Sequence, residues 1–79
     1  MTNEASMLAR SLAAEAFRVA PDVVPSDAAI GEIDAWDSLA HLRLIMALEA
    51  KLGRELTTEE AAGIVNLGDV ARVIAAAAP

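Results

Sequence analysis

Three polar side chains lie close together in residues 34–53, DAWDSLAHLRLIMALEAKLG: Asp37, Ser38 and His41. A serine and a histidine at this spacing could form a nucleophilic dyad if the segment is helical. Nucleophilic catalysis also needs an oxyanion hole and a third group that orients the histidine. The sequence indicates neither, so we predict that the chain is not an enzyme. His41 is then expected to be a surface or half-buried residue without chemistry of its own.

Two other roles for Ser38 remain open from the residues alone. In the first, Asp37 is the N-cap of a helix and Ser38 only fills the first turn, which is a common arrangement. In the second, the Ser38 hydroxyl carries a phosphate ester. A helix N-terminus favours such a group, because its free N–H groups and the positive end of its dipole attract anions.

The composition limits the possible classes of protein. The chain has 79 residues, of which 56% are hydrophobic, so we expect one small folded domain, 1–79, and no disordered chain. Phe17 and Trp36 are its only aromatic residues, so the core must be aliphatic and rich in alanine. With no cysteine and one histidine, neither a disulfide nor a protein-only zinc site is expected. Helix packing alone must stabilise the fold.

The charge and the hydropathy indicate which partners are excluded. A net charge of −6 disfavours nucleic acid and anionic membrane surfaces, and is compatible with steering toward basic protein surfaces. The N-terminal residues MTNEASMLAR do not resemble a signal peptide. No apolar run approaches the ~20 residues that a membrane span needs. We therefore expect a soluble, cytoplasmic monomer that binds other proteins.

The hydrophobic periodicity predicts helices and a long loop in the first half of the chain. The first helix is expected at residues 3–19, with Asn3 as its N-cap and Pro21 as the residue that ends it. The loop is expected at residues 21–37, and its length suggests that it packs across the bundle. Its expected apolar anchors are Val23, Val24, Ile30 and Ile33.

Two further helices are predicted after the loop. One is expected to run from Ser38 to Gly53, since glycine suits the left-handed position that ends a helix. The next is short, and Thr57 and Glu60 should form a capping box at its start.

The last helix is expected to start after Asn66 as N-cap, to run through LGDVARVIAAAA and to fray before Pro79. No stretch alternates long enough to be a strand. The predicted fold is therefore all-α, a four-helix bundle with a long first loop and a short third helix.

The helix after Ser38 has two largely apolar faces, which is more than one bundle contact needs. One face consists of His41, Leu44, Ile45, Leu48 and Leu52. The second consists of Leu39, Leu42, Met46 and Glu49, and we infer that it is partly exposed and available to a protein partner. Methionine suits this role because it adapts to different surfaces. The alternative, in which both faces are core, stays open.

Taken together, these features resemble those of acyl carrier proteins. The resemblance extends from about Glu4 to Ile74, and its most specific part is Asp37-Ser38-Leu39 in a short acidic helical chain. It implies that Ser38 receives 4′-phosphopantetheine from coenzyme A through a separate phosphopantetheinyl transferase, with Asp37 and Leu39 as motif neighbours. It also implies that an acyl group is carried as a thioester, supplied by a loading ligase and used by acyltransferases or synthases.

The chain departs from the usual pattern of this family at two places. IDAWDS replaces a Leu-Gly-x-Asp-Ser turn, and Trp36 is expected either to cap the core or to form a platform for the attached arm. Ala40 and Arg43 lie where fatty-acid carriers tend to have carboxylates, so we add Arg43 to the predicted partner face. Charges of this kind govern the choice of partner. We therefore predict a specialised pathway, related to fatty acid or polyketide biosynthesis.

Two alternatives to an acyl carrier remain at this point. Amino-acid carriers of peptide synthetases share the fold, although Asp37 favours the acyl type. A cofactor-free helical protein-interaction module would explain the apolar face but not the placement of Ser38. If cargo is sheltered between the helices, its expected lining is Phe17, Ile45, Leu48, Leu52, Leu56, Ile64 and Ile74.

Overall fold

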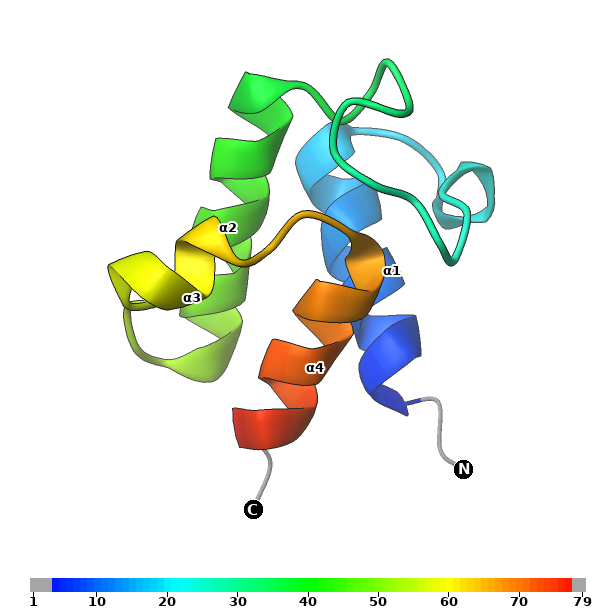
Figure 1. Ribbon diagram of the computed structural model, residues 1–79. Helices are drawn as coiled ribbons and strands as arrows, with labels where there is room; N and C mark the ends of the chain where they lie inside the picture. The colour runs from blue at the N-terminus through cyan, green and yellow to red at the C-terminus, as the bar shows by residue number, and fades with distance from the viewer. Residues whose placement is uncertain (1–3, 78–79) are drawn as a thin grey trace.

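The computed structural model describes residues 4–77 and confirms the all-α prediction. Its elements are α1 (Glu4–Phe17), the 3₁₀ helix η1 (Pro21–Val23), α2 (Ser38–Leu52), α3 (Thr58–Ala62) and α4 (Leu67–Ala77) (Figure 1). No strand occurs in residues 4–77, where one isolated antiparallel bridge joins Ala29 to Asn66. The predicted cap at Asn3 and the predicted fraying before Pro79 lie outside the described residues.

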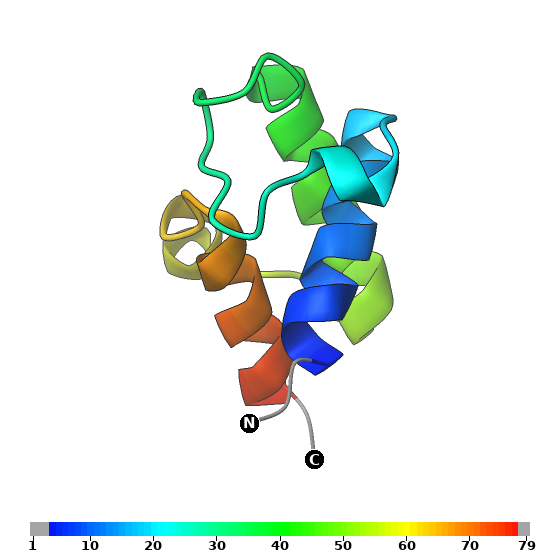
Figure 2. The ribbon, with the colours of Figure 1, turned by 90° about the vertical axis from the view of Figure 1, so that its right-hand side faces the viewer.

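The first helix is the centre of the bundle. α1 packs against both α2 and α4, and the long loop covers the end of the bundle where α1 stops and α2 begins (Figures 1 and 2). α3 is the short link between the end of α2 and the start of α4. Among the described residues, no helix combines the length and the apolarity that crossing a bilayer would require.

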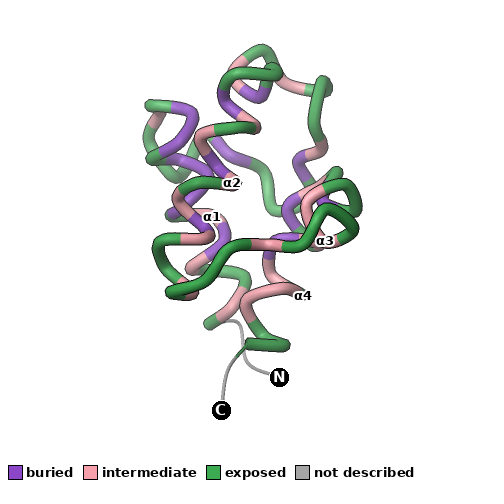
Figure 3. Tube along the Cα trace, turned by 90° about the vertical axis from the view of Figure 1, so that its left-hand side faces the viewer, coloured by how far each residue is buried: buried purple, intermediate pink, exposed green. Residues whose placement is uncertain are grey.

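The core is aliphatic and rich in alanine, as predicted, with both aromatic rings inside it. Figure 3 shows buried residues on the inner sides of the helices and in parts of the long loop. Buried alanines along α1 let the neighbouring helices approach closely. The largest fully buried side chains are Val24, Trp36, Leu44, Leu48, Ile64 and Val70.

The end of α1 differs from the prediction. The helix stops at Phe17, two residues before Val19, because Arg18 adopts a left-handed conformation with φ of 61°. The Val19 N–H then donates to the Ala14 carbonyl at 3.0 Å, and the Arg18 N–H donates to the Glu15 carbonyl at 3.3 Å. These two bonds form a Schellman motif. It usually has glycine at the left-handed position, so Arg18 itself does not signal this end in the sequence, and Pro21 indicates it only to within a few residues.

The loop packs across the bundle as expected, but on fewer of the predicted anchors. Val24 is fully buried and Ile33 is half-buried, which confirms those two. Val23 is 57% exposed and Ile30 is 37% exposed, so the prediction was wrong for them. Val23 belongs to the short turn of η1, whose adjacent side chains cannot all face inward. Ile30 lies at the rim of a surface groove described below.

Hydrogen bonds attach the loop to the helices on either side. The Arg10 Nε of α1 donates to the carbonyl oxygens of Pro21, at 3.0 Å, and Val24, at 2.8 Å. On the other side, the Leu67 N–H at the start of α4 donates to the Ala28 carbonyl at 2.9 Å. These bonds give the loop carbonyls hydrogen-bond donors, which they need because the loop packs against the bundle and not into water. They hold the segment that leads into Ser38.

The predicted ends of the later helices are confirmed. Gly53 closes α2 with φ of 75°. Thr57 and Glu60 form the complete capping box of α3. At α4, the Asn66 Oδ1 accepts from the Asp69 N–H at 2.8 Å, as an N-cap side chain does.

Candidate functional site

Ser38 is the first residue of α2, and it is exposed. Asp37 has an extended backbone before it, and its Oδ1 accepts a hydrogen bond from the Ala40 N–H at 2.9 Å. Asp37 is therefore the N-cap, while the Ser38 hydroxyl has no hydrogen bond to any other described residue. An N-cap at Asp37 and a phosphate ester on Ser38 are therefore compatible, because the cap does not use the Ser38 hydroxyl.

One face of α2 is open to solvent next to Ser38. Leu39, Leu42 and Met46 are 55%, 56% and 60% exposed, which confirms the inferred exposure of this face. Leu44 and Leu48 on the other face are fully buried. The alternative in which both faces are core is therefore wrong.

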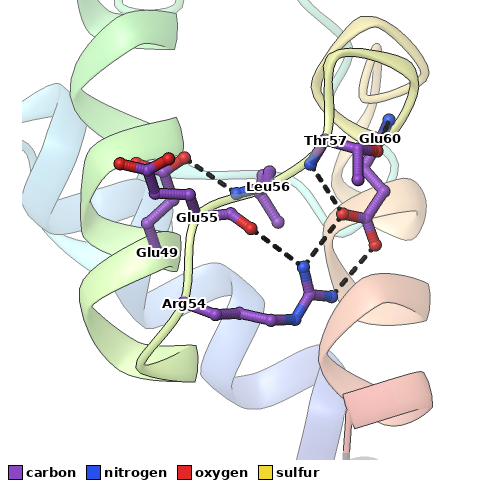
Figure 4. Close-up of polar contacts among 6 residues, drawn as sticks. All are labelled: Glu49, Arg54, Glu55, Leu56, Thr57 and Glu60. Carbon is purple, nitrogen blue, oxygen red and sulfur yellow. Dashed lines mark hydrogen bonds and ion pairs between the residues drawn. The ribbon is translucent and has the colours of Figure 1, made fainter.

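Two other residues of α2 lie differently from what the partner-face prediction assumed. Ala40 is only 3% exposed and belongs to the core, so it is not a surface position at which a charge is missing. Glu49 is half-buried, and its Oε2 accepts from the Leu56 N–H at 2.9 Å (Figure 4). This carboxylate holds the connection to α3. Arg43 is half-buried beside the open face.

An ion pair also stabilises the connection between α2 and α3. The Arg54 guanidinium donates to both carboxylate oxygens of Glu60, each at 3.0 Å, and also to the Glu55 carbonyl at 3.1 Å (Figure 4). The same Glu60 accepts from the Thr57 N–H at 2.9 Å. Hydrogen bonds from Arg54 and from the Thr57 backbone lower the pKa of Glu60 to about 2. The pair therefore stays ionised at ordinary pH and fixes α3 relative to α2.

A surface groove of about 730 Å³ lies between α2 and α3, beside Ser38. Its walls are mostly aliphatic, and Thr57 and Thr58 add hydroxyl groups at one side. Its lining includes Ser38, His41, Leu42, Ile45, Leu56 and Ile64.

Three of the seven residues that were predicted to line a cargo site line this groove. These three are Ile45, Leu56 and Ile64. The other four predicted residues lie outside this lining and pack in or against the core. They are Phe17, Leu48, Leu52 and Ile74.

Trp36 joins the loop to the start of α2. It is fully buried, and its ring lies 5.0 Å from that of Phe17, centroid to centroid. Its Nε1–H donates to the Nδ1 of His41 at 3.0 Å. Trp36 therefore caps the core, which was one of the two predicted roles. Because it is buried, it offers no exposed platform for an attached arm.

The hydrogen bond between Trp36 and His41 was not predicted from the sequence. The two residues are five positions apart, and Trp36 lies before the helix, so helical spacing does not relate them. Because Nδ1 accepts this hydrogen bond, the neutral ring carries its proton on Nε2. Burial lowers the pKa of His41 below its ordinary value. The neutral form is thus the one that this environment favours.

Comparison with known proteins gives a consistent set of relatives, although no family model matches the chain. The chain is 40% identical over 65 residues to an acyl carrier protein of Campylobacter hominis, covering 82% of each. It is 46% identical over 55 residues to an acyl carrier protein of Helicobacter pylori, covering 70% of this chain and 69% of that one. With an acyl carrier protein of Wolinella succinogenes it shares 37% identity over 65 residues, covering 82% and 86%.

Proposed function

Because the chain belongs to the acyl carrier protein family, we propose that it carries an acyl group as a thioester on 4′-phosphopantetheine attached to Ser38 and delivers that group to partner enzymes. The observation that carries this proposal is the Ser38 hydroxyl itself. It is exposed, unused by the helix cap and next to an apolar groove.

The surroundings of Ser38 suit a phosphodiester. Ser38 opens a helix of 15 residues, whose first-turn N–H groups and positive dipole end favour an attached anion. Asp37 holds that helix end in place through the Ala40 N–H. When attached, 4′-phosphopantetheine would supply the terminal thiol on which an acyl thioester forms. The chain itself then needs to supply a rigid mounting point, and the capped start of α2 supports that role.

The groove beside Ser38 supports an acyl cargo over an aminoacyl one. Leu42, Ile45 and Leu56 offer it aliphatic surface. A hydrocarbon chain gains from burial against such walls, whereas an ammonium group would lose its water without a carboxylate partner there. We therefore propose that aliphatic cargo lies partly in this groove.

The open face of α2 is the surface that we propose for partner enzymes. It consists of Leu39, Leu42 and Met46, with Arg43 at its edge, and it is named the α2 surface below. The partners expected to use it are the phosphopantetheinyl transferase, a loading ligase, and the acyltransferases or synthases that take the cargo. Glu49 is left out of the α2 surface because its carboxylate binds the Leu56 N–H.

The attachment site can be tested by intact mass. After incubation with coenzyme A and a broad-specificity phosphopantetheinyl transferase, the wild-type protein should gain one phosphopantetheine, whereas Ser38→Ala should gain none. Because Ser38 is exposed, the variant should keep its stability to within about 0.5 kcal/mol. Ser11→Ala, at an exposed serine of α1, is the matched control and should load normally. A wild-type protein that never gains this mass would favour the cofactor-free interaction module.

We further propose that the carrier serves a specialised pathway. Arg43 places a positive charge at the edge of the α2 surface, which a partner with basic docking residues would meet as repulsion. Enzymes of the host's fatty acid synthase should therefore use this protein with a kcat/KM at least about tenfold below that for the housekeeping carrier. Arg43→Glu should recover part of the difference. Equal rates on the two carriers would refute the specialised role.

A further inference from the structure

We propose that His41 is a positioning residue for the group attached to Ser38. Its Nε2–H would donate a hydrogen bond to an oxygen acceptor of that group and so hold it at the mouth of the groove. This inference rests on the proposed function, and it assigns a role to a side chain that was predicted to have no chemistry of its own.

The orientation of the imidazole ring is set from inside the core. The Trp36 Nε1–H donates to the His41 Nδ1 at 3.0 Å, and Trp36 is 0% exposed, so this donor has no access to water as an alternative. Leaving a buried N–H unpaired is unfavourable, which gives the pair a strong preference for this geometry. The ring edge that carries Nε2 is therefore turned away from Trp36.

The Nε2 atom is free and accessible. Within residues 4–77, Nε2 has no hydrogen bond or ion pair. Every buried side-chain nitrogen or oxygen in that part of the chain has a hydrogen-bond partner. Because Nε2 has none, it is not buried and must reach solvent. His41 and Ser38 are three residues apart on α2, and both line the groove. Residues at this spacing are neighbours on a helix surface. A group on the Ser38 oxygen therefore starts beside the His41 ring.

The surroundings of the ring favour its neutral form. Among the described residues, His41 is the only ionisable one that lines the groove. Along the sequence the nearest carboxylate is that of the N-cap Asp37, four residues earlier, whose Oδ1 accepts from the Ala40 N–H. Burial lowers the pKa of the imidazole. A neutral ring with Nδ1 occupied has one donor left, and that donor is the Nε2–H.

The attached group offers oxygen acceptors of two kinds. One is the anionic phosphodiester at Ser38, and the other is a neutral carbonyl farther along the arm or in the thioester. An anion close to the ring favours the imidazolium, so a phosphodiester acceptor should raise the pKa of His41 on loading. A carbonyl acceptor that covers the ring should leave this pKa unchanged or lower it.

The test is an NMR comparison of the apo protein and the phosphopantetheine-loaded protein, with loading verified by intact mass. Exchange of the His41 Nε2 proton with water should slow about two- to tenfold on loading, as expected for one net hydrogen bond. The direction of the accompanying pKa change then identifies the acceptor. Unchanged exchange in a protein that has gained the mass would overturn this inference and leave the proposed function standing. Failure to gain the mass would overturn the proposed function itself.

His41→Asn separates positioning from a purely structural role. The asparagine Oδ1 can still accept the Trp36 N–H, but nothing replaces Nε2. The Trp36 indole N–H signal should therefore persist in this variant. In the loaded wild type, the ³¹P or amide signals of the arm should shift with the titration of His41, and in loaded His41→Asn this shift should vanish. Arm signals that titrate identically in both proteins would overturn the proposal.

Discussion

Replacing Trp36 by alanine should destabilise the protein by about 3–5 kcal/mol. Trp36 is fully buried, packs on Phe17 and donates to His41, so its removal leaves a cavity and deletes a hydrogen bond. A chain of 79 residues has a thin core, and its total stability is expected to be of the same size as this loss. Urea unfolding followed by far-UV circular dichroism should show a variant that is largely unfolded before denaturant is added.

Trp36→Phe is the matched variant for this prediction. Phenylalanine restores most of the apolar volume but not the N–H, so its loss of stability should be clearly smaller than that of Trp36→Ala. The Nδ1 of His41 loses its donor in both variants. A Trp36→Ala protein within about 1 kcal/mol of the wild type would show that Trp36 does not organise the loop against the core.

Replacing Met46 by alanine should lower the kcat/KM of loading by a phosphopantetheinyl transferase about 30-fold. Met46 lies at 60% exposure on the α2 surface, and we expect it to act as a hot spot, whose truncation costs about 2 kcal/mol of binding. Little stability should be lost, since most of the side chain is already in water. The measurement is the initial rate of mass gain at limiting protein concentration.

Met7 provides an unusually close control for Met46. It is also a methionine in a helix and is 67% exposed, but it belongs to α1 and lines a different surface hollow with Arg10 and Leu67. Met7→Ala should load at the wild-type rate. If both variants load equally well, the α2 surface is not where the transferase binds.

Much of the fold was determined by the sequence through local contacts. The N-cap at Asp37, the capping box of Thr57 and Glu60, and the left-handed Gly53 all lie where the sequence predicts them. Each involves a hydrogen bond or a backbone preference within a few residues, so residue type and spacing were sufficient. The position of Ser38 at the start of a helix follows from the same rules.

Which parts of the helices and of the long loop contact one another was decided by the tertiary structure alone. Arg18 ends α1 by adopting a left-handed conformation directly after Phe17. Val23 and Ile30 turn outward, and the buried Ala40 contributes nothing to the surface. The pairing of Trp36 with His41 joins a loop to a helix across a spacing that no helical period relates.

The groove beside Ser38 also shows what the sequence predicts and what only packing decides. Seven apolar residues were predicted to line a cargo site, and packing placed Ile45, Leu56 and Ile64 along the groove, whereas Phe17 and Leu48 lie in the core away from it. Local rules determine where a helix begins and which residues on it are apolar. Which apolar residues are covered depends on how distant segments fit together, and that is a property of the folded volume.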